Sequence, residues 1–271
     1  MSAEFSVSMS PLPRELLVAG CQDLGWLNGE QPPDPVSPGS WGAFRDRIST
    51  RVTAIEYSDG QLDVTVPVGA ALEDCDLALG IVRRVAAAAG ADIGTEAGTL
   101  TINELDEVFG ASWKHEQLES AARTVIHLLR QRGGPIAMPG PTRSVYVGER
   151  VASELESGDP EAIGDRLVAV ARRVLWPDSR YESAAQLTAT NPRSGEEFSL
   201  TMLLPERACV LPAADRIAVD DPQGAFMIPR SALEHLPVEA AFLDDRNQLV
   251  EPVSASVWPD LCRVARAYEI S

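Results

Sequence analysis

The first hundred residues switch between the hydrophobic period of strands and that of helices. Apolar side chains alternate with polar ones in the strand segments, and they recur every three to four residues in the helical ones. The elements predicted from this pattern are strands at 3–9, 51–57 and 62–68, helices at 15–24 and 74–90, and a weak strand near 91–93 or 98–101. Their order favours a ferredoxin-like βαββαβ unit in the N-terminal half.

Turn and cap residues separate these elements. Ser58-Asp59-Gly60 supplies a tight turn between the two central strands, which predicts a β-hairpin. Residues 28–40 contain four prolines and two glycines, so we expect a loop or insertion there. Asp74 is the expected N-cap of the helix at 74–90, and Gly90 is expected to end that helix.

Two further helices follow. Thr101-Ile-Asn-Glu104 has the spacing of a capping box and opens a short helix to Phe109. A longer helix is predicted from Ser112 to Arg132, and Gly133-Gly134-Pro135 ends it. The stretch Gly133–Leu155 then packs glycines and prolines around a short apolar run. We therefore expect it to divide the chain into an N-terminal α+β half, residues 1–132, and a C-terminal α+β half, residues 133–271.

The second half combines helices with short strands. Asp159-Pro160-Glu161 gives an N-cap, a first-turn proline and a first-turn acid for a helix to about Leu175. Short antiparallel strands are predicted at 187–190, 198–203, 209–211, 216–219, 225–228, 240–243 and 248–250, with a terminal helix at 257–268. The fold class predicted for the whole chain is α+β.

Charge narrows the classes of partner. The chain has 271 residues, a formal net charge of −17 and a pI near 4.6. Phosphate backbones and anionic bilayers repel such a surface, whereas a basic protein is attracted to it. Five acids and one lysine lie within 103–119, so we expect no helix-turn-helix contact with DNA. Net negative charge also keeps a protein in solution without any partner.

Composition predicts a reduced bacterial cytoplasm. Only Lys114 among the 23 basic residues is lysine, which together with many alanines is typical of a GC-rich bacterial gene. The four cysteines are far apart and form no Cys-x-x-Cys pair. We expect no leader segment and no membrane span, because no apolar run approaches about 18 residues.

The motifs of common enzymes are absent from the sequence. It contains no Gly-x-Ser-x-Gly, no phosphate-binding glycine loop and no His-Glu-x-x-His, so the catalytic residues are unknown and an enzyme is the less favoured interpretation. His115, His127 and His235 are interpreted as surface side chains. The acid pairs Asp220-Asp221 and Asp244-Asp245 are typical of turns rather than of a metal site. We expect no metal and no cofactor.

The loop at 138–150 is the one local candidate for a site. Thr142 and Arg143 follow Pro139-Gly140-Pro141, Tyr146 lies on the next short strand, and Arg150 begins the following helix. Helix N–H groups and guanidinium groups can bind an anion there. The alternative interpretation is a rigid connection in which prolines limit the unfolded chain and glycines permit the turns.

Three functions remain as hypotheses. The favoured one is a non-catalytic module of the immunity or antitoxin type, whose acidic surface binds a basic protein partner. The second is an enzyme or small-ligand binder with its site at 138–150. The third is a subunit of a larger assembly, since the oligomeric state does not follow from the sequence.

Overall fold

The computed structural model describes residues 2–21 and 23–270, and these form two compact units. The first unit ends at Leu175 and the second begins at Trp176. Both units combine helices with largely antiparallel sheets, which confirms the predicted α+β class. The boundary between the units differs from the expected division at 132/133, because residues 133–175 pack with the chain that precedes them.

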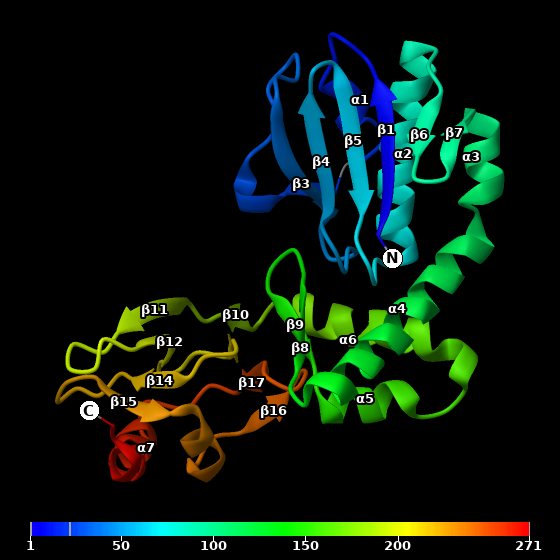
Figure 1. The fold of residues 1–271 in the computed structure, drawn as a ribbon. Coiled ribbons are helices and arrows are strands. Elements are labelled where there is room, and N and C mark those ends of the chain that lie inside the picture. Colours follow the sequence, from blue (N-terminus) through cyan, green and yellow to red (C-terminus); the bar gives the residue numbers. More distant parts are fainter. Residues whose placement is uncertain (1, 22, 271) are drawn as a thin grey trace. The chain divides into compact units, whose positions relative to one another are not determined.

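A seven-stranded antiparallel sheet is the main layer of the first unit (Figure 1). Its spatial order is β2-β3-β4-β5-β1-β6-β7. The strands are β1 (Ala3–Ser8), β2 (Leu24–Trp26), β3 (Gly39–Arg45), β4 (Thr53–Ser58), β5 (Gln61–Val66), β6 (Ile93–Thr95) and β7 (Gly98–Leu100). The hairpin β4–β5 turns at Asp59 and Gly60, both with positive φ, as the sequence predicts.

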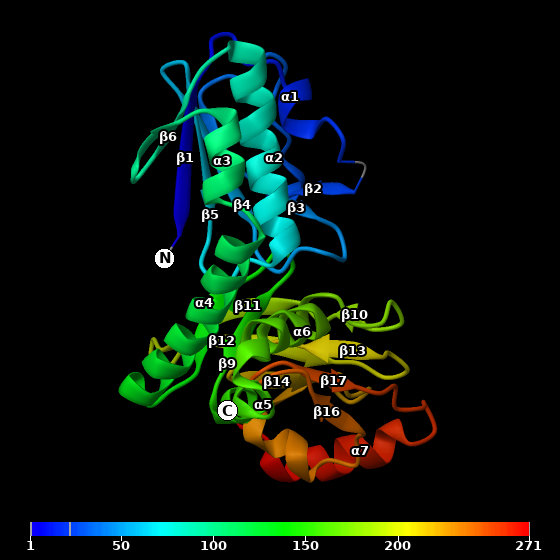
Figure 2. The same cartoon turned by 90° about the vertical axis from the view of Figure 1, so that its right-hand side faces the viewer.

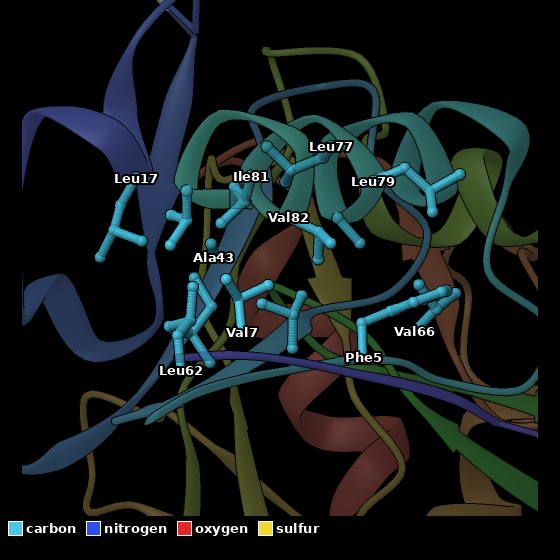
Figure 3. Close-up of a cluster of buried hydrophobic side chains, with 14 of the residues drawn as sticks. Phe5, Val7, Leu17, Ala43, Leu62, Val66, Leu77, Leu79, Ile81 and Val82 are labelled. Carbon is cyan, nitrogen blue, oxygen red and sulfur yellow. The ribbon is translucent and has the colours of Figure 1, made fainter. Parts of the chain in front are cut away.

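Helices cover one side of this sheet only (Figures 1 and 2). They are α1 (Glu15–Val18), α2 (Leu72–Ala89) and α3 (Ile102–Val108), and a 3-10 turn η1 (Leu27–Gly29) follows β2. The apolar stripe of α2, which includes Ile81 and Val82, packs on Phe5, Val7 and Leu62 of the strands (Figure 3). These side chains alternate with polar ones along each strand, so only one face of the sheet is apolar.

The ferredoxin-like arrangement is not confirmed. A split βαβ unit needs parallel strands joined by a crossover helix. Here β1 pairs antiparallel with both β5 and β6, and the helix after β1 has four residues. Strands β2 and β3 flank the expected loop at 28–40 on either side. They add two strands at the sheet edge that the hydrophobic pattern does not reveal.

Two helices begin with a different N-cap residue from the one predicted. The N-cap of α2 is Ala71, and Asp74 lies three residues inside the helix, where its carboxylate accepts a hydrogen bond from the Ala71 N–H at 3.0 Å. Helix α4 (Ala111–Arg132) has Gly110 as its N-cap rather than Ser112. The capping box at α3 is confirmed, since Thr101 and Glu104 each accept a bond from the other's backbone N–H.

The rest of the first unit is a helical layer with one hairpin. Its elements are α4, β8 (Ile136–Pro139), β9 (Ser144–Val147), α5 (Glu149–Glu156), η2 (Pro160–Ala162) and α6 (Ile163–Leu175). Helices α4 and α6 pack closely, and Gly164 permits this because a Cβ there would lie 2.9 Å from the Leu118 side chain. None of the helices in residues 2–21 and 23–270 is both long and apolar enough to cross a membrane.

The second unit has two four-stranded sheets. One has the order β10-β13-β17-β16 and the other β11-β12-β14-β15. The elements are β10 (Glu182–Ser183), β11 (Gln186–Thr190), β12 (Glu197–Leu203), β13 (Cys209–Leu211), β14 (Arg216–Val219), β15 (Phe226–Pro229), η3 (Arg230–His235), β16 (Ala240–Phe242), β17 (Gln248–Val250), α7 (Trp258–Ala265) and η4 (Arg266–Tyr268). The core includes Ile217 and Ile228 of the sheet and Trp258 and Leu261 of α7.

Candidate functional site

The loop at 138–150 is the turn of the β8–β9 hairpin together with the start of α5. Thr142 Oγ1 donates a hydrogen bond to the backbone oxygen of Leu175 at 2.9 Å, and Arg143 Nη1 donates one to that of Val174 at 2.7 Å. These oxygens belong to the last turn of α6. Carbonyl oxygens in the last turn of a helix have no N–H donor within the helix. Thr142 and Arg143 therefore cap the C-terminus of α6, a contact that the sequence did not predict.

Tyr146 and Arg150 lie on the elements after that turn. Tyr146 is half-buried on β9 opposite Ala137, and Arg150 is exposed in the first turn of α5. Thr142 and Arg143 thus both contact the end of α6, whereas Tyr146 and Arg150 lie on β9 and α5. Their role in binding a ligand stays a prediction, and the capping contacts give Thr142 and Arg143 a structural role that is independent of it.

A buried polar cluster that the sequence analysis did not single out surrounds Asp74. This carboxylate is fully buried, and its Oδ2 accepts hydrogen bonds from Thr50 N (3.0 Å), Thr50 Oγ1 (2.8 Å), Arg51 N (3.1 Å) and Ala71 N (3.0 Å). Burial raises the pKa of Asp74, while hydrogen bonds from Ser49, Thr50 and Ala71 oppose that shift. Asp74 therefore fixes the segment before β4 to the start of α2.

Two arginines extend this cluster towards the hairpin and α6. Arg51 Nη1 donates to the backbone oxygen of Pro139, and burial lowers the pKa of Arg51 although Asp74 raises it. Arg172 of α6 donates to the backbone oxygen of Ile48 at 3.2 Å and pairs with Glu73 at 2.7 Å. Each guanidinium thus connects segments that lie about 90 or more residues apart in the sequence. The cluster therefore links the β-sheet part of the first unit to its helical part.

The histidines and acid pairs have local partners. His115 Nδ1 lies 2.9 Å from the Ala111 oxygen, His127 Nε2 lies 2.8 Å from Gln131, and His235 stacks on Tyr268. Asp221 accepts a hydrogen bond from Gln223 N, and Asp244 accepts from Arg246 N and Asn247 N, which is the turn chemistry expected of both pairs. Across the described residues, no three His, Cys, Asp or Glu side chains converge as metal ligands would.

The uncovered face of the seven-stranded sheet is the most distinctive surface. The register places Glu56 directly opposite Asp63 on neighbouring strands, and Glu4 lies on the same face of β1. On β1, β4 and β5 the other side chains that share this face are small or polar: Ser6, Ser8, Ala54, Ser58, Gln61 and Thr65. On β3 the same face carries Ser40 and, at its far end, Phe44. None of them is basic, and no ion pair within the described chain includes the three carboxylates. We call these three residues and their small neighbours the acidic sheet face.

A cavity of about 260 Å³ lies at the rim of this face, where β1 begins. Of the described residues of β1, only Phe5 and Ser6 pair with β6, so Ala3 and Glu4 have no strand partner on that side. The cavity is lined by these two residues, by Glu96 and Ala97 of the β6–β7 turn, and by residues of α3 and α4 and the junction between them. We call it the β1–α4 cavity.

Strand pairing made these two features invisible to sequence reasoning. Glu4, Glu56 and Asp63 are ordinary surface acids until the register brings them to one face. The alternation of buried and exposed positions along β1, β4 and β5 was the available signal, but it does not specify which strands are neighbours. No protein-family model matches this chain, and no curated protein or solved structure matches it significantly.

Proposed function

We propose that this chain is a non-catalytic interaction module of the immunity or antitoxin type, and that its acidic sheet face binds a basic protein partner. The observation that supports this proposal is the Glu56–Asp63 pair. Two carboxylates directly opposite each other on an antiparallel pair repel and cost stability. Gln61 Nε2 donates a hydrogen bond to Asp63 at 2.8 Å, but it brings no charge to balance the pair. A cation bound between them removes that repulsion.

The chemistry of the face also favours a protein partner. Between Glu4 on β1 and Glu56 on β4 this face carries the short polar side chains of β5, and helices cover only the opposite side (Figure 2). Basic side chains can reach these carboxylates without displacing any intramolecular cation. The overall charge of −17 adds long-range attraction, which raises the rate of encounter with a basic protein.

The setting that we propose is the bacterial cytoplasm. It rests on the arginine-rich composition, in which Lys114 is the single lysine, and on four cysteines that are all free thiols. Free, mostly buried cysteines are typical of a reducing compartment.

The proposal is tested with a matched pair of double variants. Glu56→Gln/Asp63→Asn and Glu196→Gln/Glu197→Gln each remove two charges, the first pair from the acidic sheet face and the second from an exposed turn and strand end in the other unit. A nine-residue arginine peptide serves as the basic probe, and its affinity is measured by fluorescence anisotropy at about 50 mM and 300 mM salt.

We expect the sheet-face variant to weaken binding about tenfold and to flatten its salt dependence, with less than a twofold change in the control. Equal weakening by both variants would mean that the charge acts through the whole surface and would refute a specific face. Affinity capture from cells of the native host, with the wild type and both variants in parallel, then tests whether one stoichiometric protein depends on Glu56 and Asp63. Light scattering on the purified chain tests the remaining hypothesis of a larger assembly.

A further inference from the structure

We infer that the β1–α4 cavity receives one arginine side chain of the basic partner. This inference rests on the proposed function and deepens it, because it assigns a pocket to a single cationic group. The cavity adjoins the acidic sheet face through Glu4, which belongs to both. A basic segment lying on that face can therefore place a side chain in the cavity.

The lining of the cavity is suited to a planar cation. Phe109 and Trp113 line it, with ring centroids 4.8 Å apart and an interplanar angle of 79°. Phe109 also packs edge-on against buried Phe5 at 4.8 Å, so the aromatic wall is anchored in the core of the unit. Aromatic rings attract cations electrostatically, and a guanidinium group can stack on them as well.

Carboxylates complete this environment. Glu4 and Glu96 are both exposed, both line the cavity, and neither forms an ion pair within the described chain. No basic residue is among the lining side chains. The nearby cation Lys114 is engaged elsewhere, because its ammonium group pairs with Asp76. The residues that line the cavity therefore include two carboxylates without an ion-pair partner and two aromatic rings.

Size favours a side chain over a larger ligand. The volume of about 260 Å³ is below the ~300–1,000 Å³ that pockets for drug-sized molecules occupy. Val108, which lines the cavity, is 50% exposed and offers an apolar contact to the aliphatic part of an arginine side chain. An arginine is preferred to a lysine because its fork can bond a carboxylate with two parallel N–H groups.

The test uses the full chain and two small probes. N-acetyl-arginine amide and its neutral isostere N-acetyl-citrulline amide are titrated into the protein, and the indole N–H of Trp113 is followed by NMR. The resonance is assigned by its loss in Trp113→Phe. We expect a saturable shift of that signal with the arginine probe and none with citrulline. N-acetyl-lysine amide is expected to bind several-fold more weakly than the arginine probe.

Charge variants show whether the cavity carboxylates are responsible. Glu4→Gln/Glu96→Gln is expected to weaken the arginine probe three- to tenfold, whereas Asp92→Asn, an exposed acid outside the cavity lining, leaves it unchanged. An equal response to arginine and citrulline, or an unchanged affinity in the double variant, would overturn the inference.

The same variants separate this inference from the proposed function. If Glu56→Gln/Asp63→Asn weakens the arginine peptide but Glu4→Gln/Glu96→Gln does not, the cavity assignment fails and the acidic sheet face stands. If the arginine probe binds the cavity saturably while the affinity of the arginine peptide is unchanged in Glu56→Gln/Asp63→Asn, the proposed face fails and the cavity assignment stands.

Discussion

Replacing Asp74 with alanine removes the acceptor that holds the segment before β4 on α2. In the wild type one fully buried oxygen accepts bonds from three backbone N–H groups and one hydroxyl. The Ala71 N–H and the Thr50 hydroxyl keep other bonds after the substitution, to each other and to the Gly69 oxygen. Among the described residues, the N–H groups of Thr50 and Arg51 have no other acceptor.

The expected loss of stability follows from those two groups. A buried donor without an acceptor costs about 1–3 kcal/mol. The Thr50 N–H is buried and carries this cost in full, whereas the Arg51 N–H is part-buried and costs less, so we expect about 2–5 kcal/mol for the pair. Removing a buried carboxylate returns part of this free energy, because burial disfavours its charged form, as the raised pKa of Asp74 shows. We therefore expect Asp74→Ala to lower the free energy of unfolding of the first unit by about 3 kcal/mol.

Urea denaturation and hydrogen exchange measure this effect separately. Unfolding followed by circular dichroism gives the loss of stability, and NMR-detected exchange shows where it arises. The amides of Thr50 and Arg51 are expected to lose protection beyond that of the rest of β4. Asp76→Ala is the matched control, since Asp76 is 59% exposed in its pair with Lys114 and should cost under about 1 kcal/mol. Equal losses in the two variants, or unchanged protection at Thr50 and Arg51, would refute this reasoning.

Three further predictions concern the same unit. Because the folded pKa of Asp74 is raised, the folded state binds more protons. The stability of the wild type relative to Asp74→Asn should therefore be greatest below about pH 4 and fall as the pH rises through the raised pKa, as urea denaturation at several pH values can show. Gly140→Ala should cost about 1–3 kcal/mol, because its Cβ would lie 2.4 Å from the Leu175 side chain, whereas Gly134→Ala enters open space and should change the melting temperature little. Arg143→Ala should lower the melting temperature, because it removes the hydrogen bond that caps α6. An unchanged melting temperature would contradict the capping role and favour the hypothesis that Arg143 binds a ligand.

Local sequence signals were sufficient for most caps and turns, although they missed β2 and β3 and predicted a longer helix than α1. The capping box at Thr101–Glu104, the hairpin turn at Asp59-Gly60 and the helix stop at Gly133 were predicted from residues that interact with their immediate neighbours. Caps and tight turns depend on nearby backbone geometry, so four to six residues specify them. The α+β class followed from the same patterns.

Asp74 shows where local reasoning reached its limit. The sequence presented it as a helix cap, and its position near a helix start was right to within three residues. Its partners Thr50 and Arg51 come from a segment more than twenty residues earlier, and no periodicity of the chain reveals them. The same holds for Arg143, whose placement on a stiff loop was predictable but whose acceptor in α6 was not.

The sequence by itself determined the acidic character of the chain and the alternation of apolar and polar positions along its strands. Tertiary structure decided that β1 pairs between β5 and β6, which brings Glu4 beside the hairpin of Glu56 and Asp63 and opens the β1–α4 cavity. The physical reason is that alternation fixes which side chains share a face of one strand, whereas strand order and register depend on contacts far apart in the chain.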